Sequence, residues 1–241
     1  MKETKQVEGY VIHLSQYKEN DVIVTLLTRE GLISFRARGA KKITSKNSSS
    51  LLLLSFSSFF LENFNDFWTL KEGKVLQEPS YQDDLVHMSA LSFIAEICSK
   101  LVMEDVAESA YLWLETAMES IKKGFSPLTS ALLLLAKYIE LEGYGLDVDE
   151  CVFCRKKTAI IGIDFDAGGF VCENEDPIAL KRMNSRFLQI YRYIFRCSVS
   201  DFSRVAFSNR ECVEIIGELS EYISHNLGIS FKTLKLLTIC E

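Results

Sequence analysis

The chain has 241 residues, of which 48% are hydrophobic and 25% are charged, so it has enough apolar side chain to build a core. This composition excludes a disordered chain, a collagen and a simple coiled coil. The 27 basic and 33 acidic residues give a net charge of -6, which excludes a uniformly basic nucleic-acid binder but permits a local basic patch. With only 3 prolines and 12 glycines, much of the sequence favours long helices.

The sequence predicts a cytoplasmic protein without membrane contact. No stretch reaches the ~20 apolar residues that a membrane span needs, and Met1–Lys5 lacks the apolar segment of a secretory signal. The chain contains 7 cysteines, an odd number that argues against a secreted disulfide framework. Four of them lie in apolar surroundings and are predicted to be buried thiols: Cys98, Cys197, Cys212 and Cys240.

The first 80 residues have the patterns of β-strands. Residues Val22–Leu27 are apolar and rich in β-branched side chains, Arg29–Gly31 is a predicted turn, and Leu32–Arg38 alternates, so this region is expected to form a hairpin. Further strands are expected at Val7–Leu14, at Leu51–Leu61, and at Phe67–Leu70, the last turning through Lys71–Lys74 onto Val75–Leu76. Five strands in about 80 residues fit a small closed barrel such as the five-stranded OB-fold.

After residue 80, apolar residues recur every three or four positions, which predicts helices. Three are expected before the cysteine pair: one over residues 85–101, one ending at Gly124, and one starting at Ser126-Pro127 and ending at Glu142. Two amphipathic stripes follow, over residues 187–195 and 213–223. The expected fold class is therefore α+β, with an N-terminal OB-fold barrel (residues 1–80) and a helical domain (residues 81–241). A zinc-ribbon-like segment is inserted in the helical domain at about residues 148–178.

Charge divides unevenly between the two halves. Residues 1–80 contain 11 basic and 9 acidic residues, whereas residues 81–241 contain 16 basic and 24 acidic residues. The excess of positive charge is largest in residues 29–46. The basic residues of this segment are the predicted DNA contacts: Arg29, Arg36, Arg38, Lys41, Lys42 and Lys46. Arg36 and Arg38 share the outward face of their strand because side chains alternate, and the loop after them can follow a phosphate backbone.

Binding of single strands without sequence preference also needs aromatic side chains on which bases stack. Tyr10, Tyr17 and Phe35 are the nearest aromatic residues, but Phe35 falls on the face opposite the arginines and is expected in the core. The alternative interpretation of the basic segment is a solvated strand face followed by a mobile, serine-rich loop. Charge alone does not separate the two interpretations.

Three cysteines have the spacing of the first three ligands of a zinc ribbon: Cys151, Cys154 and Cys172. The fourth position is Glu175, whose carboxylate can also bind zinc, so the predicted site holds one zinc ion on these four residues. The alternative is a β-hairpin that packs without metal. A redox role for the Cys151/Cys154 pair is a weaker interpretation, because the pair lies in a loop between helical segments.

The sequence contains no recognisable catalytic constellation. A phosphate-binding loop is absent, the pattern of a zinc deaminase is not met, and the histidines His13, His87 and His225 are isolated. The acidic clusters Asp83–Asp84 and Asp147–Glu150 could bind a metal in a nuclease, but they are more typical of helix starts and loops. We expect a protein that is not an enzyme. A metal-dependent nuclease and an OB-containing adaptor that binds only proteins are the alternatives.

Several segments in the same order resemble the bacterial RecO family of recombination mediators. They are Gly9–Ile12, Tyr17–Ile33, Arg38–Lys42 with Ser45, the cysteine segment Cys151–Cys172, and the tail elements Tyr222–Gly228 and Lys232–Leu234. The similarity spans nearly the whole chain. Glu175 departs from the four-cysteine pattern of the family, and some members of the family also lack the zinc cysteines.

This resemblance implies an OB-fold followed by a helical domain that carries the cysteine knuckle. Proteins of this family bind single- and double-stranded DNA, anneal complementary strands and, with RecR and often RecF, load RecA on gaps covered by single-strand-binding protein. It further implies that the C-terminal tail of single-strand-binding protein contacts the acidic helical half, and that the protein is associated with the nucleoid. These activities break no covalent bond.

Overall fold

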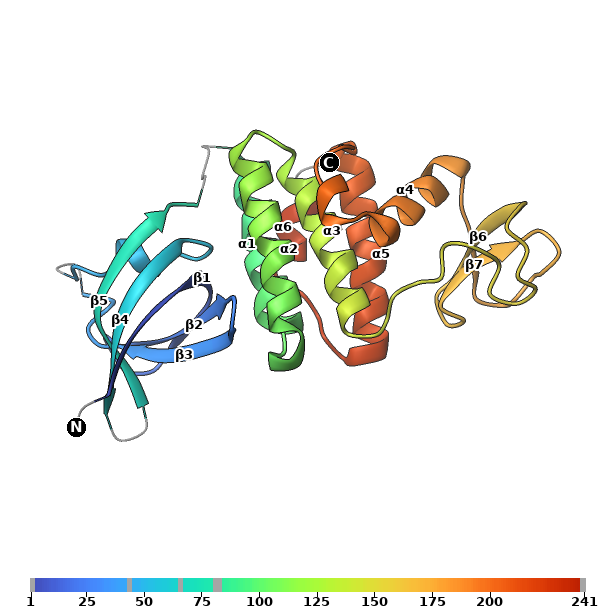
Figure 1. Ribbon diagram of the computed structural model, residues 1–241. Coiled ribbons are helices and arrows are strands. Elements are labelled where there is room, and N and C mark those ends of the chain that lie inside the picture. Colours follow the sequence, from blue (N-terminus) through green and yellow to red (C-terminus); the bar gives the residue numbers. More distant parts are fainter. Residues whose placement is uncertain (1–2, 43–44, 65–66, 80–83, 239–241) are drawn as a thin grey trace. The chain divides into compact units, whose positions relative to one another are not determined.

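The computed structural model describes residues 3–42, 45–64, 67–79 and 84–238. The chain forms two compact units, Met1–Met118 and Glu119–Glu241, and Figure 1 shows the order of their elements. The division falls within helix α2 (Ala107–Lys122), further along the chain than residue 80, and the first unit includes helix α1 (Leu85–Leu101), which packs against the first strand.

The first unit contains a closed five-stranded barrel, as predicted. Its strands are β1 (Thr4–Gln16), β2 (Val22–Thr28), β3 (Gly31–Ala37), β4 (Phe56–Phe64) and β5 (Phe67–Gln77). They close in the order β1-β2-β3-β5-β4, with β1 pairing with β4. Neighbouring strands are antiparallel except β3 and β5, which run parallel where Arg36 lies opposite Thr69. Figure 1 shows these strands curving around one another. The fold is OB-like, and the fold class is α+β as predicted.

Every second side chain of a barrel strand points inward, and these side chains fill the barrel. Along β3, Phe35 and Ala37 are buried whereas Ser34 is exposed, because successive side chains of a strand point to opposite faces. The rings of Phe35 and Phe59 lie 5.0 Å apart, centroid to centroid. The buried core consists of Val11, Val22, Val24, Leu26, Phe35, Ala37, Leu51, Phe59, Leu61 and Leu70. Burial of each large apolar side chain stabilises the fold by about 1.5–3 kcal/mol relative to its exposed state.

Two strand predictions were wrong in their bounds. The strand expected at Leu51–Leu61 begins only at Phe56, because Ser49–Leu51 forms a short 3-10 helix, η1, that places Leu51 in the core. The turn expected at Lys71–Lys74 does not exist, since β5 continues through it and its Gly73 lies against Ser50. A Cβ atom at position 73 would come within 2.3 Å of the Ser50 hydroxyl oxygen, so the glycine serves a close approach and not a turn.

The first unit continues with α1, the 3-10 helix η2 (Glu104–Val106) and α2. Asp84 caps α1 by accepting a hydrogen bond from the Val86 N–H, 3.2 Å away. Tyr10 of β1 is buried between two rings, those of Phe56 at 5.0 Å and Tyr111 of α2 at 5.9 Å. These contacts fix one end of the barrel to α2.

The second unit contains three long helices, as predicted from their stripes: α3 (Pro127–Leu141), α4 (Ser185–Arg196) and α5 (Asn209–Leu227). A 3-10 turn, η3 (Val199–Asp201), precedes α5, and a short helix, α6 (Leu234–Leu237), follows it. The predicted start of α3 is confirmed, because the Ser126 hydroxyl accepts from the Thr129 N–H and Pro127 opens the helix. Gly228 ends α5 with φ of 69°. Among the predicted buried thiols, Cys98, Cys197 and Cys212 are buried, and Cys240 lies outside the described residues.

A small sheet is inserted between α3 and α4. Its strands are β6 (Ile160–Asp164), β7 (Gly169–Cys172) and β8 (Leu180–Arg182), in the order β7-β6-β8. The sequence predicted a cysteine knuckle here but not the third strand. Gly168 adopts φ of 78° in the turn before β7, which explains why a glycine stands there.

Among the described residues, no single helix is long and apolar enough to cross a membrane. Only the bent pair of α1 with residues Glu104–Lys122 passes such a test, by length and composition.

Candidate nucleic-acid interface and cysteine cluster

The basic loop, residues 38–46 after β3, is hydrogen-bonded to the loop between β1 and β2. Asp21 makes these bonds: one carboxylate oxygen accepts the Gly39 N–H at 2.8 Å, and the other accepts two N–H groups of Arg36 at 3.0 and 2.5 Å. The Gly39 hydrogen bond and the Arg36 guanidinium hold the pKa of Asp21 below its ordinary value. A backbone hydrogen bond from the Lys41 N–H to the Asn20 carbonyl, 3.1 Å long, also joins the two loops.

Arg36 is therefore engaged within the protein. Its side chain is 24% exposed, and its guanidinium also lies 4.9 Å from the centroid of the Tyr17 ring. Sequence reasoning placed Arg36 correctly on the outward face of β3 but treated it as a phosphate contact equal to Arg38. In the structure it first positions the loop.

The other predicted contacts of this loop are exposed. Lys41 donates to the Gln16 side-chain oxygen at 2.9 Å. Within the part of the chain that the structure describes, no ion pair involves Arg38, Lys42 or Lys46. Residues 43–44 of the same loop lie outside the described residues. Four cations with accessible charge thus follow one short loop, the arrangement that neutralises successive phosphates.

Of the three aromatic candidates, only Tyr17 is available for stacking. Tyr10 and Phe35 are buried, as expected for Phe35, whereas Tyr17 is 53% exposed. The Tyr17 ring is flanked by two cations, Arg36 at 4.9 Å and Lys18 at 5.7 Å. An exposed ring between cations, next to a basic loop, can stack a base while the loop holds the backbone.

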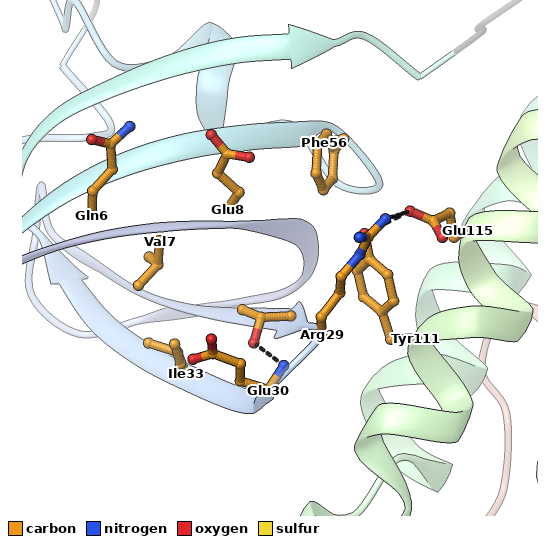
Figure 2. Close-up of a pocket in the computed structure, with 10 residues that line it drawn as sticks. Gln6, Val7, Glu8, Arg29, Glu30, Ile33, Phe56, Tyr111 and Glu115 are labelled. Atoms are coloured by element: carbon orange, nitrogen blue, oxygen red, sulfur yellow. Dashed lines mark hydrogen bonds and ion pairs between the residues drawn. The ribbon is translucent and has the colours of Figure 1, made fainter.

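Arg29 lies at the opposite end of the β2–β3 hairpin from the basic loop. Its guanidinium pairs with Glu115 of α2 at 2.9 Å and lies 5.6 Å from the Tyr111 ring centroid. Figure 2 shows Arg29 extending toward Glu115, with Tyr111 beside it. Glu115 raises the pKa of Arg29. Arg29 and Glu115 help to line a cavity of about 420 Å³, which Glu8 and Glu30 also line. The structure thus separates Arg29 from the other predicted DNA contacts.

The sequence offered signals for this network that were not used. Asp21 stands within the Glu19-Asn20-Asp21 motif, but only the pairing of β2 with β3 brings it opposite Arg36 and Gly39. Asn47 was also missed: its side-chain oxygen accepts the Gly73 N–H at 3.0 Å and so holds the far end of the basic loop on β5.

The cysteine cluster brings three of the four predicted ligands together. The Sγ atoms of Cys151, Cys154 and Cys172 all lie within 4.8 Å of one another, and those of Cys154 and Cys172 are 3.4 Å apart. Tetrahedral zinc with Zn–S bonds of 2.3 Å requires sulfur separations of about 3.8 Å, so the three thiols fit three corners of a zinc site. Glu175 is outside this group, although its backbone N–H donates to the Cys172 carbonyl at 3.1 Å.

The thiols differ in acidity. Burial raises the pKa of Cys151, but hydrogen bonds from the backbone N–H groups of Cys154, Cys172 and Phe153 outweigh it and lower that pKa to about 7. For Cys154, a backbone hydrogen bond at Lys156 lowers the pKa. The neighbouring thiols and burial raise it by a larger amount, so that the pKa of Cys154 is about 11. A cation that binds cysteine thiols displaces their protons, so metal binding at this cluster would release protons.

Asp83 lies outside the described residues, and the other members of the two acidic clusters have structural partners. Asp84 caps α1, Arg155 pairs with Asp147 and Glu150, and Arg196 pairs with Asp149. Among the residues that can be described, the three cysteines are the one group of His, Cys, Asp or Glu side chains close enough to share a metal ion. The geometry therefore offers no support for a nuclease site on these carboxylates.

Two family models match this chain. The one described as Recombination protein O N terminal matches residues 1–79, and the one described as Recombination protein O C terminal matches residues 82–235. The DNA repair protein RecO of Halalkalibacterium halodurans is 24% identical over 243 residues, covering 98% of this chain and 95% of that protein. The protein of the same name from Bacillus subtilis (strain 168) is 27% identical over 244 residues, covering 97% and 94%. The similarity extends over both compact units.

Proposed function

The chain belongs to the recombination protein O family, which acts in DNA repair, and from this premise we propose that it is a recombination mediator. In this proposal it binds single- and double-stranded DNA and anneals complementary strands. With RecR, and with RecF where required, it helps to load RecA on DNA coated by single-strand-binding protein. The observation that carries the proposal is the basic loop, held by Asp21 at the open end of a hairpin in an OB-like barrel.

The loop supplies the binding energy in this proposal. Cations that neutralise phosphates release counterions, so affinity falls as salt rises, with a slope of about 0.7 per phosphate on single strands. Arg38, Lys41, Lys42 and Lys46 are the proposed phosphate contacts, and Tyr17 is the proposed stacking platform. Because phosphates and ring faces are common to all sequences, such a site binds without sequence preference.

The helical half is proposed to serve protein contacts. Residues 81–241 carry 24 acidic against 16 basic residues, which disfavours general DNA binding and suits partners such as RecR. The C-terminal tail of single-strand-binding protein is the second proposed partner. A cytoplasmic, nucleoid-associated location follows from the DNA role.

One zinc ion on Cys151, Cys154 and Cys172, with Glu175 as fourth ligand, is proposed as a structural cofactor. The three sulfur atoms support the proposal by their spacing. Bound there, zinc would hold the knuckle folded and would not take part in a reaction, since a closed four-ligand site leaves no open position for substrate. We accordingly propose a mediator that acts by binding and not as an enzyme.

A salt series tests the DNA proposal. The affinity for a labelled single strand would be measured by fluorescence anisotropy for the wild type, for Lys41→Ala/Lys42→Ala, and for Lys122→Ala/Lys123→Ala. The last variant removes the same charge from exposed lysines at the end of α2. The loop variant is expected to bind several-fold more weakly, with a slope of log affinity against log salt shallower by about 1.4.

Equal binding by the two variants would remove the loop from the interface. Annealing without divalent metal or nucleotide would distinguish a mediator from a metal-dependent nuclease, which would shorten the labelled strand. A wild type with no affinity for DNA would favour the adaptor that binds only proteins.

A further inference from the structure

We propose that the tip of the cysteine knuckle is a second nucleic-acid contact, in which Phe153 stacks a base and Lys156 and Lys157 bind phosphates. The inference rests on the proposed function, because it gives an annealing protein a second point of attachment to DNA. The two contacts lie in different compact units of the chain, the barrel in the first and the knuckle in the second. A single molecule could then hold two strands, or two parts of one strand.

The backbone of the tip presents these side chains outward. The Cys151 N–H donates to the Lys156 carbonyl at 2.8 Å, and the Arg155 N–H donates to the Cys151 carbonyl at 2.9 Å. Arg155 itself turns the chain with φ of 63°. This tight turn leaves every residue from Phe153 to Ala159 exposed, and Phe153 is 49% exposed.

The tip, residues 153–159, carries three cations, Arg155, Lys156 and Lys157, and no carboxylate. The nearby carboxylates of Asp147 and Glu150 are engaged with Arg155, at 3.4 and 3.1 Å. Lys156 and Lys157 are both exposed, and no ion pair involves either of them in the described ranges of the chain. Two exposed lysines beside an exposed aromatic ring are the elements of a sequence-tolerant single-strand contact.

The tip stands on a rigid base. The Val152 N–H donates to the Phe170 carbonyl of β7 at 2.9 Å, and the Phe170 N–H donates to the Asp147 carbonyl at 2.9 Å. From α4, Arg192 donates to the Val148 carbonyl at 2.9 Å. A contact supported in this way loses little conformational entropy when it binds a ligand.

The shape favours a nucleic acid over an acidic peptide. A peptide with an apolar end requires a concave, apolar site to bury that end. Here seven consecutive residues, 153–159, are all exposed. An exposed ring can stack against an unpaired base, whose two faces are both open, without any surrounding pocket.

The test uses the full-length protein and three variants: Phe153→Ala, Lys156→Ala/Lys157→Ala, and the charge-matched control Lys122→Ala/Lys123→Ala. A biotinylated single strand loaded with protein captures a second, non-complementary, fluorescent strand, and the retained fluorescence is measured. Phe153→Ala and the knuckle lysine variant are expected to reduce capture about tenfold, as the loss of one stacked base or two phosphate contacts predicts. The control should capture like the wild type.

The outcomes separate this inference from the function on which it rests. If Lys156→Ala/Lys157→Ala captures like the control while Lys41→Ala/Lys42→Ala still weakens binding, the knuckle contact is wrong and the barrel proposal stands. If the wild type binds no strand at all, both fail. A knuckle variant that loses affinity for an aspartate-rich peptide but not for DNA would overturn the inference in favour of a protein partner. Because the substituted side chains are exposed, an unchanged melting temperature is expected for all variants.

Discussion

Asp21 shows how a single acidic residue can belong to a basic surface. Its two carboxylate oxygens bind different groups, the Gly39 N–H and the Arg36 guanidinium, so that one side chain fixes both the strand end and the start of the loop. Anchored loops bind with less loss of conformational entropy than free ones. The carboxylate, although it repels phosphate, should therefore support DNA binding.

Substitution of Asp21 by Ala is expected to weaken single-strand binding about threefold, because the loss of the anchor outweighs the loss of a repulsive charge. Anisotropy at constant salt measures the effect. Glu19→Ala is the control: Glu19 is an exposed acid of the same loop, and its removal should leave affinity unchanged or slightly raised. If both variants bind more tightly than the wild type, the anchoring role is wrong.

The Arg186–Glu211 pair gives a second expectation, for stability against pH. The Arg186 guanidinium, with support from Ser208, lowers the pKa of Glu211 to about 2 from an ordinary 4.5. A carboxyl with a depressed pKa stabilises the folded state fully above pH 4.5, and this contribution is lost as pH falls toward 2. Arg186→Gln should therefore lower stability at pH 7, by about 1 kcal/mol at most because the arginine is half exposed.

Urea denaturation at pH 7 and near pH 3 would measure this difference. The gap between wild type and Arg186→Gln should shrink at the lower pH. Lys123→Gln is the matched control, because its pair with Glu119 is largely exposed on both sides and should show no such trend. Equal gaps at both pH values would contradict the assignment.

At the scale of elements, glycines explain where the knuckle docks. A Cβ atom at Gly169 of β7 would lie 2.4 Å from the Asp147 carbonyl oxygen and 2.8 Å from Val152. Because the first neighbour is backbone, the clash cannot be relieved by a side-chain rotation. The strand can approach the knuckle only without a side chain at this position.

Gly169→Ala is accordingly expected to lower the free energy of unfolding by about 1–3 kcal/mol, the range for overpacked sites. Gly217→Ala, in the middle of α5 with nothing within 4 Å, should instead raise it by about 0.5–1 kcal/mol, because alanine favours helix. Thermal melts of the two variants, which differ from the wild type by one methyl group each, would show shifts of opposite sign. Shifts of the same sign would show that the close approach is not what selects the glycine.

Elements with a clear period or cap could be predicted, whereas elements set by distant contacts could not. The hairpin of Val22 to Arg38 and the helix after Ser126-Pro127 follow from local pattern. The run Lys71–Lys74 has the composition of a turn, yet it lies within β5 because Gly73 accommodates Ser50 from η1, a contact that no local pattern encodes.

The candidate site divides in the same way. Spacing alone indicated the three cysteines, and charge alone indicated the basic loop. Arg29 pairs with Glu115, and Arg36 pairs with Asp21; these partners are 86 and 15 residues away in the sequence, so local pattern does not reveal them. Exposure also selected Tyr17 from three aromatic candidates, since Tyr10 is buried by a helix that lies far along the chain.

For the whole molecule, net charge hides the distribution that matters. The chain carries -6 in total, but the loop after β3 and the segment at the knuckle tip are each locally basic, while acidic residues outnumber basic ones in the helical half. Under the proposed function, such a distribution would limit DNA to local contacts and leave the remaining surface available to protein partners. It is consistent with a molecule that brings partners together on DNA.

The β2–β3 hairpin has two ends with different attachments. At the turn, Arg29 pairs with Glu115, and the Leu32 N–H donates to Glu104, whereas the open end leads into the basic loop. Substitutions in the hairpin should therefore fall into two classes of allele. Substitutions at the turn should give temperature-sensitive proteins that retain DNA affinity at low temperature, and those at the open end should give stable proteins defective in repair. Complementation between the classes would then reveal whether the protein acts as one molecule or several.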